Sequence, residues 1–163
     1  MTNWVRDVAE SGIFYKPSDL PEEYGAHRIP SGWIVINNDY LTFKAVSEEA
    51  NITFKKGLDT TFKYSLNNGS WLEYQDQQVI NLNQNDTVKF FGENNQDINP
   101  GFNWNHQFQI TGLVESFGNI HSLTNFDTQY VGFYNLFRGC SGLLTAPSLP
   151  ALDLKSNCYK SMF

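Results

Sequence analysis

The sequence predicts a mainly β fold in three consecutive parts: an extended N-terminal arm, an antiparallel β-sandwich and the start of a repeat solenoid. Three observations lead to this expectation. Proline and glycine recur through residues 1–36, short runs with period-two alternation fill residues 37–124, and an internal repeat occupies residues 125–163. We therefore assign the arm, the sandwich and the first part of the repeat region to these three ranges.

The arm combines many chain breaks with many large apolar side chains. The breaks exclude a helix or a long strand: Gly12, Pro17, Pro21, Gly25, Pro30 and Gly32. Its aromatic side chains need a surface, which is either the arm's own following domain or another protein. The second alternative predicts a docking arm whose contacts are led by Trp4, Phe14, Tyr15 and Trp33.

Eight short β-rich runs follow the breaks. They cover 33–36, 41–46, 52–55, 61–66, 71–74, 79–82, 87–91 and 107–111. In one of them Phe62, Tyr64 and Leu66 lie two apart, as a half-buried strand requires. Asn67-Asn68-Gly69 and Asn83–Asp86 are predicted turns, because Asn and Gly tolerate positive φ. This spacing of strands indicates an antiparallel, immunoglobulin-like sandwich.

The last part repeats with an offset of 26 residues, which aligns Leu136-Phe137 with Met162-Phe163 and Phe133 with Tyr159. A period in the twenties is typical of a solenoid, and about three repeats are the usual minimum for stability. We therefore expect the chain to continue beyond residue 163, or a partner to cover the open end. Without such a cover, four apolar side chains are expected to be exposed in part: Leu143, Leu149, Leu154 and Met162.

The two cysteines, Cys140 and Cys158, lie 18 positions apart with no other cysteine in the chain. A disulfide and a metal site are both conceivable, but no further Cys and no His stands near them in sequence. We expect both thiols to be reduced and packed as small interior side chains.

The motif Phe137-x-Gly-Cys-Ser-x-Leu143, followed by Ala146-Pro-x-Leu-Pro-Ala151 and Asn157-Cys-Tyr-x-x-Met-Phe163, resembles the leucine-rich repeats of BspA-type surface proteins. The preceding part is similar to a domain found before such repeats in proteins of gut Bacteroidales and their phages. That similarity rests on four segments: 41–45, 64–71, 85–92 and 117–123. The resemblance implies a leucine-rich solenoid that serves as a binding or display surface.

Composition excludes several functions. The formal net charge of −6 argues against a nucleic-acid backbone as ligand, and no apolar run is long enough to span a membrane. The start, MTNWVRDVAESG, lacks the pattern of a secretory signal.

His27, His106 and His121 form no catalytic or metal-binding pair, so we expect no enzyme activity, no cofactor and no metal. Three aromatic residues at or beside turns are candidates for stacking on sugars: Trp71, Tyr74 and Trp104.

These observations favour a non-enzymatic structural and attachment protein of a phage virion, such as a head or tail fibre. In this hypothesis the arm anchors the protein to other virion proteins, and the repeats present a surface to a host glycan or surface protein. We expect a homo-oligomer on the virion surface. An exported bacterial adhesin of the BspA type on the cell surface and a carbohydrate-binding module of a larger protein remain the alternatives.

Overall fold

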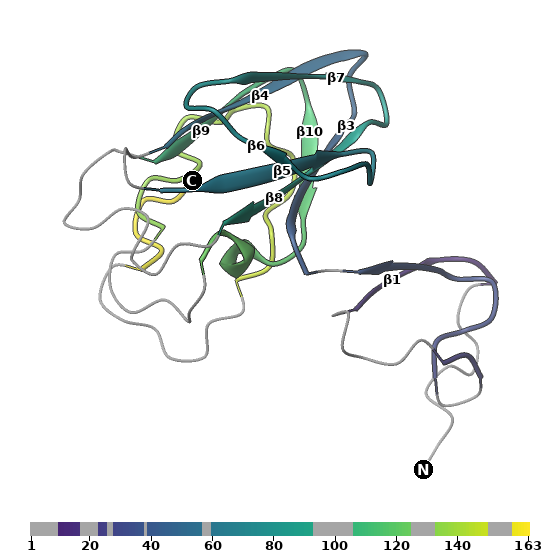
Figure 1. The fold of residues 1–163 in the computed structure, drawn as a ribbon. Coiled ribbons are helices and arrows are strands. Elements are labelled where there is room, and N and C mark those ends of the chain that lie inside the picture. Colours follow the sequence, from purple (N-terminus) through teal and green to yellow (C-terminus); the bar gives the residue numbers. More distant parts are fainter. Residues whose placement is uncertain are drawn as a thin grey trace. The chain divides into compact units, whose positions relative to one another are not determined.

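The computed structural model describes residues 10–16, 23–25, 28–37, 39–56, 60–92, 106–124, 133–149 and 158–163 (Figure 1). The chain divides into two compact units, Met1–Asp39 and Tyr40–Phe163. The larger unit contains both the predicted sandwich and the described residues of the repeat region.

The first unit contains a small parallel sheet. Strand β1 (Ile13–Lys16) pairs with β2 (Ile34–Asn37) in parallel, so that Ile13 lies opposite Ile34. Each strand has four residues and fits between the breaks that the sequence places around it. The β-rich run predicted at 33–36 corresponds to β2, whose pairing partner is β1 rather than a sandwich strand.

The second unit is built from two antiparallel sheets with almost no helix, which confirms the prediction of a mainly β fold. The five-stranded sheet has the order β10-β3-β8-β5-β6. Its strands are β3 (Leu41–Ala45), β5 (Phe62–Leu66), β6 (Leu72–Glu73), β8 (Thr87–Gly92) and β10 (Val114–Phe117). The three-stranded sheet, in the order β7-β4-β9, consists of β4 (Glu49–Lys55), β7 (Val79–Asn83) and β9 (Gln107–Thr111).

The core lies between the two sheets, and aromatic rings are most of its largest fully buried side chains. Alternate residues of β4, β7 and β8 are buried, as period two requires. Phe43 of the five-stranded sheet and Phe108 of the three-stranded sheet have ring centroids 5.1 Å apart. Phe54 and Phe62, also from different sheets, meet edge to face at 4.8 Å. The two sheets therefore face each other across interlocking rings, which is the arrangement of a β-sandwich.

Asparagine residues form the tight turns that the sequence predicts. Asn67 and Asn68 both have positive φ, at 49° and 58°, and Asn85 has a φ of 71°. The carboxylate of Asp86 accepts hydrogen bonds from the backbone N–H of Asn83 at 2.9 Å and from the side-chain amide of Asn67 at 2.7 Å. These bonds stabilise the charged carboxylate and lower the pKa of Asp86 below its ordinary value. One carboxylate thus ties the two predicted turns together.

The chain crosses from one sheet to the other at Gly112, between β9 and β10. This residue has a φ of +78°, and a Cβ there would collide with the backbone of Glu49 and Ala50. Strand β10 was not among the predicted β-rich runs, and only Val114 and Phe117 of its four residues are apolar. The structure instead pairs β10 with β3, with Val114 opposite Ala45.

No leucine-rich repeat solenoid is present among the residues that the structure describes. A short 3-10 helix, η2 (Ile120–Leu123), follows β10, and its Ser122 hydroxyl accepts from the N–H of Leu41 at 2.8 Å and donates to the carbonyl of Phe90 at 3.0 Å. The described residues beyond Thr124 form turns and isolated bridges that pack on the sandwich.

His106 is a buried titratable group, with 4% of its surface exposed. Its Nε2 lies 3.0 Å from the Thr60 hydroxyl, and the rings of Phe54 and Phe62 lie against it at 6.1 Å. Burial, with a smaller contribution from the charge of Lys56, lowers the pKa of His106 from 6.5 to about 4. The folded protein therefore holds this histidine neutral at mildly acidic pH.

We predict that the free energy of unfolding falls as the pH drops from 6.5 to about 4. The unfolded chain binds a proton on His106 below pH 6.5, whereas the folded chain does so only near pH 4, so acid favours unfolding. The full loss is about 3 kcal/mol. Urea unfolding at a series of pH values measures it. His106→Gln should flatten the curve in this window; a dependence that survives His106→Gln would contradict the prediction.

Candidate functional site

The exposed ring of Trp71 belongs to a three-membered aromatic cluster on the larger unit. Trp71 is 39% exposed and precedes β6. Tyr40, just before β3, meets it edge to face with centroids 4.9 Å apart, and Phe91 of β8 lies 6.0 Å from Trp71 and 5.8 Å from Tyr40. The structure thus places Trp71 where a ligand could stack on it, and it adds Tyr40 and Phe91, which the sequence analysis did not connect with it.

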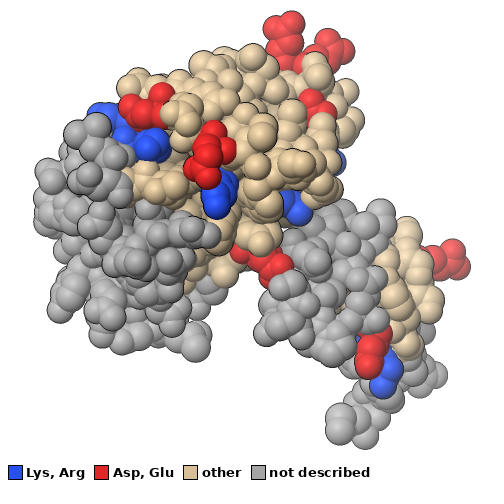
Figure 2. Space-filling view, in the orientation of Figure 1, with Lys and Arg blue, Asp and Glu red and all other residues tan. Residues whose placement is uncertain are grey.

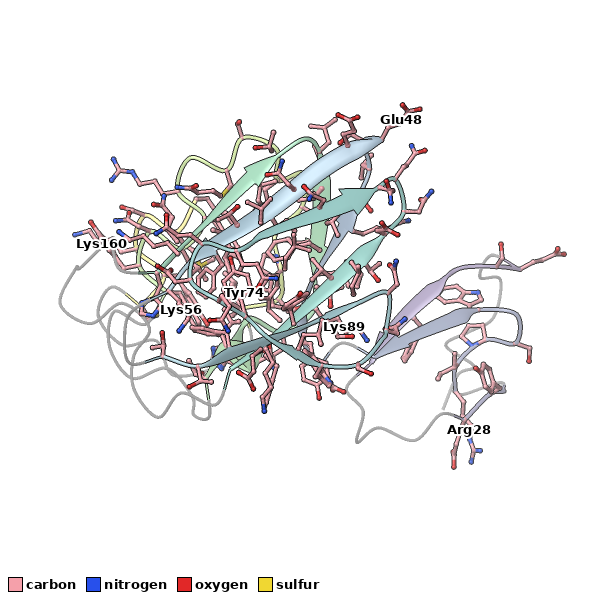
Figure 3. The ribbon with its side chains drawn as sticks, turned by 45° about the horizontal axis from the view of Figure 1, so that its top comes forward. Arg28, Glu48, Lys56, Tyr74, Lys89 and Lys160 are labelled. Atoms are coloured by element: carbon pink, nitrogen blue, oxygen red, sulfur yellow. The ribbon has the colours of Figure 1, made fainter. Side chains whose placement is uncertain are left out.

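Tyr74 was predicted as a second stacking residue, but its ring lies in the core with 2% exposure (Figure 3). Its hydroxyl accepts from the N–H of Phe54 at 2.6 Å and donates to the carbonyl of Gln78 at 2.7 Å. Burial raises the pKa of Tyr74 to about 12. The ring is therefore not available to a sugar, and Tyr74 has a structural role between the two sheets. Trp104, the third candidate, lies outside the described residues.

Two of the four proposed docking side chains of the arm are described. Phe14 and Trp33 are both partly buried within the first unit. The ring of Trp33 covers Gly12 so closely that a Cβ at Gly12 would come within 2.8 Å of it. Tyr15 lies in β1, but its side chain is outside the described set, and Trp4 lies outside the described residues altogether. Trp33 thus has an internal partner in its own unit.

The 26-residue repeat of the sequence forms a pair of stacked turns. The backbone N–H groups of Phe133, Asn135 and Phe137 donate to the carbonyls of Cys158, Lys160 and Met162 at 2.9, 3.4 and 2.7 Å. The rings that the offset aligns also stack face to face. The centroids of Phe133 and Tyr159 are 5.8 Å apart with 7° between the planes, and those of Phe137 and Phe163 are 5.7 Å apart with 17°.

These stacked rings continue an aromatic column that begins inside the sandwich. Phe54 stacks on Phe108 at 4.3 Å, Phe108 on Phe137 at 5.3 Å, and Phe137 on Phe163 at 5.7 Å. The column leads from a fully buried ring to one that is 58% exposed. The repeat region is thus rooted in the sandwich core through Phe137.

The segment 142–148 runs parallel to the edge strand β10. The N–H of Val114 donates to the carbonyl of Gly142 at 2.9 Å, and the N–H of Leu144 donates to the carbonyl of Val114 at 2.8 Å. Further along, the Thr145 hydroxyl accepts from the N–H of Ser116 at 2.8 Å and donates to its carbonyl at 2.7 Å. The tail therefore covers this edge of the five-stranded sheet.

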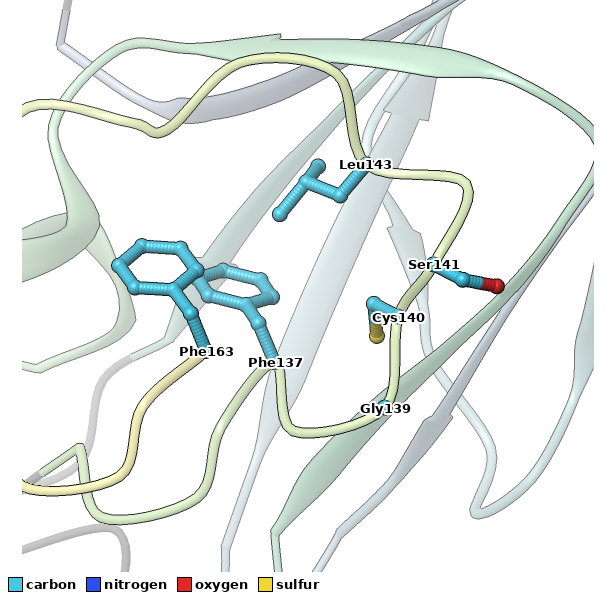
Figure 4. Close-up of a pocket in the computed structure, with 6 residues that line it drawn as sticks. All are labelled: Phe137, Gly139, Cys140, Ser141, Leu143 and Phe163. Carbon is cyan, nitrogen blue, oxygen red and sulfur yellow. The ribbon is translucent and has the colours of Figure 1, made fainter.

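A hollow of about 280 Å³ opens beside the last ring of the column (Figure 4). It is lined by Phe137, Gly139, Cys140, Ser141, Leu143 and Phe163. Leu144 is 50% exposed nearby in the chain, and Leu149 is 39% exposed, as predicted. Leu143 is partly buried, whereas Met162, which was expected to be exposed, is 98% buried because it packs in the core. Leu154 lies outside the described residues.

Both cysteines are free, which confirms the prediction of reduced thiols. Cys158 is buried, and the partly buried thiol of Cys140 donates to the carbonyl of Phe108 at 3.1 Å. Burial raises the pKa of Cys140 to about 11, so this thiol stays protonated at neutral pH and is a poor nucleophile.

Groups that could carry catalysis are separated among the described residues. His106 is enclosed in the core, and His121 stacks on Phe133 at 5.6 Å with its Nε2 3.0 Å from the Tyr159 hydroxyl. His27 lies outside the described residues. Within the described ranges, no three His, Cys, Asp or Glu side chains come together as a metal site would require. Acidic and basic side chains are interspersed on the face that Figure 2 shows.

The described part of the chain contains no helix that is both long and apolar enough to cross a membrane. Comparisons with family models, with curated protein sequences and with solved structures found no match to this chain.

We predict that Gly142→Ala loosens the tail from the sandwich. A Cβ at Gly142 would overlap the carbonyl oxygen of Gly112, which is backbone and cannot rotate away. Overpacking of this kind costs about 1–3 kcal/mol of unfolding free energy. Urea unfolding of Ser141→Ala, at the exposed neighbouring position, should differ from wild type by no more than about 0.5 kcal/mol. Equal stability of the two variants would contradict this account.

We also predict that the purified chain self-associates through the open end, because Leu144, Leu149 and Phe163 present apolar surface there. Leu144→Lys combined with Leu149→Lys should shift sedimentation-velocity profiles toward the monomer. Val79→Lys is the matched control, since Val79 is 54% exposed but lies on β7, at the opposite edge of the three-stranded sheet from β9. A wild-type chain that is monomeric at every concentration would refute the prediction.

Proposed function

We propose that this protein is a non-enzymatic attachment protein of a phage virion, in the manner of a head or tail fibre. The observation that carries the proposal is the in-register stacking of the 26-residue repeat on the sandwich. In this proposal the sandwich is immunoglobulin-like, and the stacked turns are the beginning of a leucine-rich solenoid of the BspA type. The proposed family rests on the sequence motif around Cys140 and Cys158.

The stacked turns are suited to display because they extend the fold instead of closing it. The backbone N–H groups of Phe133, Asn135 and Phe137 in one turn donate hydrogen bonds to the next turn. The outermost ring, that of Phe163, remains exposed. Repeat proteins grow in this way, each unit contacting its neighbours, and their stacks form broad binding surfaces. The exposed Leu144 and the hollow beside Phe163 lie where a further turn would add. In the proposal, that turn and those after it build the surface that meets the host.

The first unit is suited to anchoring. It forms a compact unit of its own, and the sheet seen among its described residues has two strands. An isolated two-stranded sheet is marginally stable in water, so such a unit gains much from a partner surface. We assign Trp4, Phe14, Tyr15 and Trp33 to this contact, with Trp33 acting partly through its own packing on Gly12.

A second candidate function is a carbohydrate-binding module within a larger protein. The exposed ring of Trp71 favours it, because Tyr40 and Phe91 hold that ring at the surface. Aromatic faces that are fixed in this way bind the apolar face of a sugar ring at little entropic cost. This function would need no virion and no repeat stack. The exported adhesin of a bacterial surface is the third candidate, and it shares the display surface with the first.

We expect an antibody raised against residues 40–163 to label the head or tail fibres of phage particles released by a Bacteroidales host that carries this gene. Immunogold electron microscopy makes the measurement. Deleting residues 1–39 from the gene should leave particles that form but carry no label, because the anchor is lost. Purified residues 40–163 should still fold, as circular dichroism would show.

Two other labelling patterns would count against the virion proposal. Label on the cell envelope in the absence of particles would support the adhesin. Label on neither structure, together with retention of the chain on an insoluble polysaccharide that Trp71→Ala abolishes, would support the carbohydrate-binding module. If the truncated chain were incorporated normally, the anchor would lie outside residues 1–39.

A further inference from the structure

The outer face of the three-stranded sheet is a polar surface. On the outer face of the three-stranded sheet, Asn51 of the central strand β4 stands opposite Asn81 of β7 and Thr111 of β9. Glu49 and Asn83 form the next pair along the same face. The burial pattern confirms that these side chains point away from the core, since the residues between them, Ala50 and Leu82 among others, face the core.

This face is hollowed. A groove of about 350 Å³ is lined by Glu48, Glu49, Ala50, Asn51, Asn81, Leu82, Asn83 and Thr111. Its size is in the range of small-ligand sites and suits one or two sugar rings. Glu48 stands at one end of the sheet, where its side chain extends away from the strands (Figure 3).

The side chains that line the groove favour one class of ligand. Among the described residues that line it there is neither Lys nor Arg and no aromatic ring, which disfavours an anion or a flat apolar molecule. Its two carboxylates, Glu48 and Glu49, accept hydrogen bonds, whereas each Asn amide both donates and accepts. The side chains of Asn51, Asn81 and Thr111 have no hydrogen-bond partner among the described residues. A ligand with many neutral hydroxyl groups can satisfy all of these atoms, because each hydroxyl donates once and accepts twice.

The groove is also rigid. Strand β4 is held on both sides, by β7 and by β9, and Asn51 lies at the middle of the pairing with β7 and at the end of the pairing with β9. Side chains directly opposite on neighbouring strands have Cβ atoms about 5 Å apart, which lets Asn51 and its partners contact different hydroxyls of one ring. Rigid donors and acceptors lose little entropy on binding.

We propose that this groove, centred on Asn51 and Asn81, binds a neutral glycan. The site lies on the sandwich and is separate from the repeat surface, so it does not depend on whether the protein belongs to a virion, a cell surface or a larger enzyme. It is also separate from the exposed ring of Trp71, which is held by Tyr40 and Phe91 instead.

The test is a titration of the ¹⁵N-labelled full chain with the methyl glycosides of glucose, galactose, mannose and N-acetylglucosamine. Nuclear magnetic resonance observes the side-chain amides of Asn51 and Asn81 directly. At least one glycoside should shift these two signals and the backbone signal of Thr111 in a saturable way. Asn51→Ala should raise its Kd about tenfold, the effect of losing one good hydrogen-bonding partner.

Gln109→Ala is the matched control. Gln109 is exposed on the same face, two residues from Thr111 on β9, but it does not line the groove. This variant should bind like wild type, and both variants should keep the wild-type spectrum elsewhere. The proposal fails if none of the four glycosides shifts the two amides, or if the shifts gather at the Trp71 indole N–H instead. It also fails if sialyllactose or inorganic phosphate binds the groove as well as the neutral sugars do.

Discussion

The ring of Phe108 is the contact on which the rest of this fold depends. It is fully buried and stacks on Phe54 at 4.3 Å and on Phe137 at 5.3 Å, with Phe43 and Phe90 packed around it. Its backbone takes part as well, since the N–H donates to the carbonyl of Leu136 at 2.8 Å and the carbonyl accepts from the thiol of Cys140. One residue thus joins the two sheets to each other and joins both to the tail. Burial of a ring this size is worth roughly 1.5–3 kcal/mol.

Much of the fold could be predicted from local patterns. The alternation around Phe108 and the Asn turns depend on neighbouring residues, so the sequence analysis found those strands and turns close to their true positions. The pairing of strands that lie far apart in the chain could not be predicted, because it does not depend on neighbouring residues. Strand β10 has too few apolar residues to stand out, and the partner of Ile34–Asn37 could not be inferred, because β1 lies about 20 residues earlier in a segment full of breaks.

In the candidate sites too, local patterns could be predicted from the sequence and long-range contacts could not. The 26-residue offset predicted which rings of the tail correspond, and the structure stacks Phe133 on Tyr159 and Phe137 on Phe163. Tyr74 was misassigned because a position beside a turn does not reveal on which side of the sheet a ring lies. The groove centred on Asn51 and Asn81 could not be predicted from the sequence. Asn51, Asn81 and Thr111 come from three separate strands, and only the register of β4 with β7 and β9 brings them together.

The parallel run of 142–148 along β10 has a consequence for how this protein can be divided. A strand edge that loses its cover is a template for pairing with other chains, and natural proteins rarely leave one bare. A gene fragment that ended after η2 would uncover β10, release Leu136 from β9 and strip one face of the Phe108 ring at once. The sandwich and the turns that pack on it therefore fold as one unit, and a domain boundary drawn between Thr124 and Phe133 would cut through it.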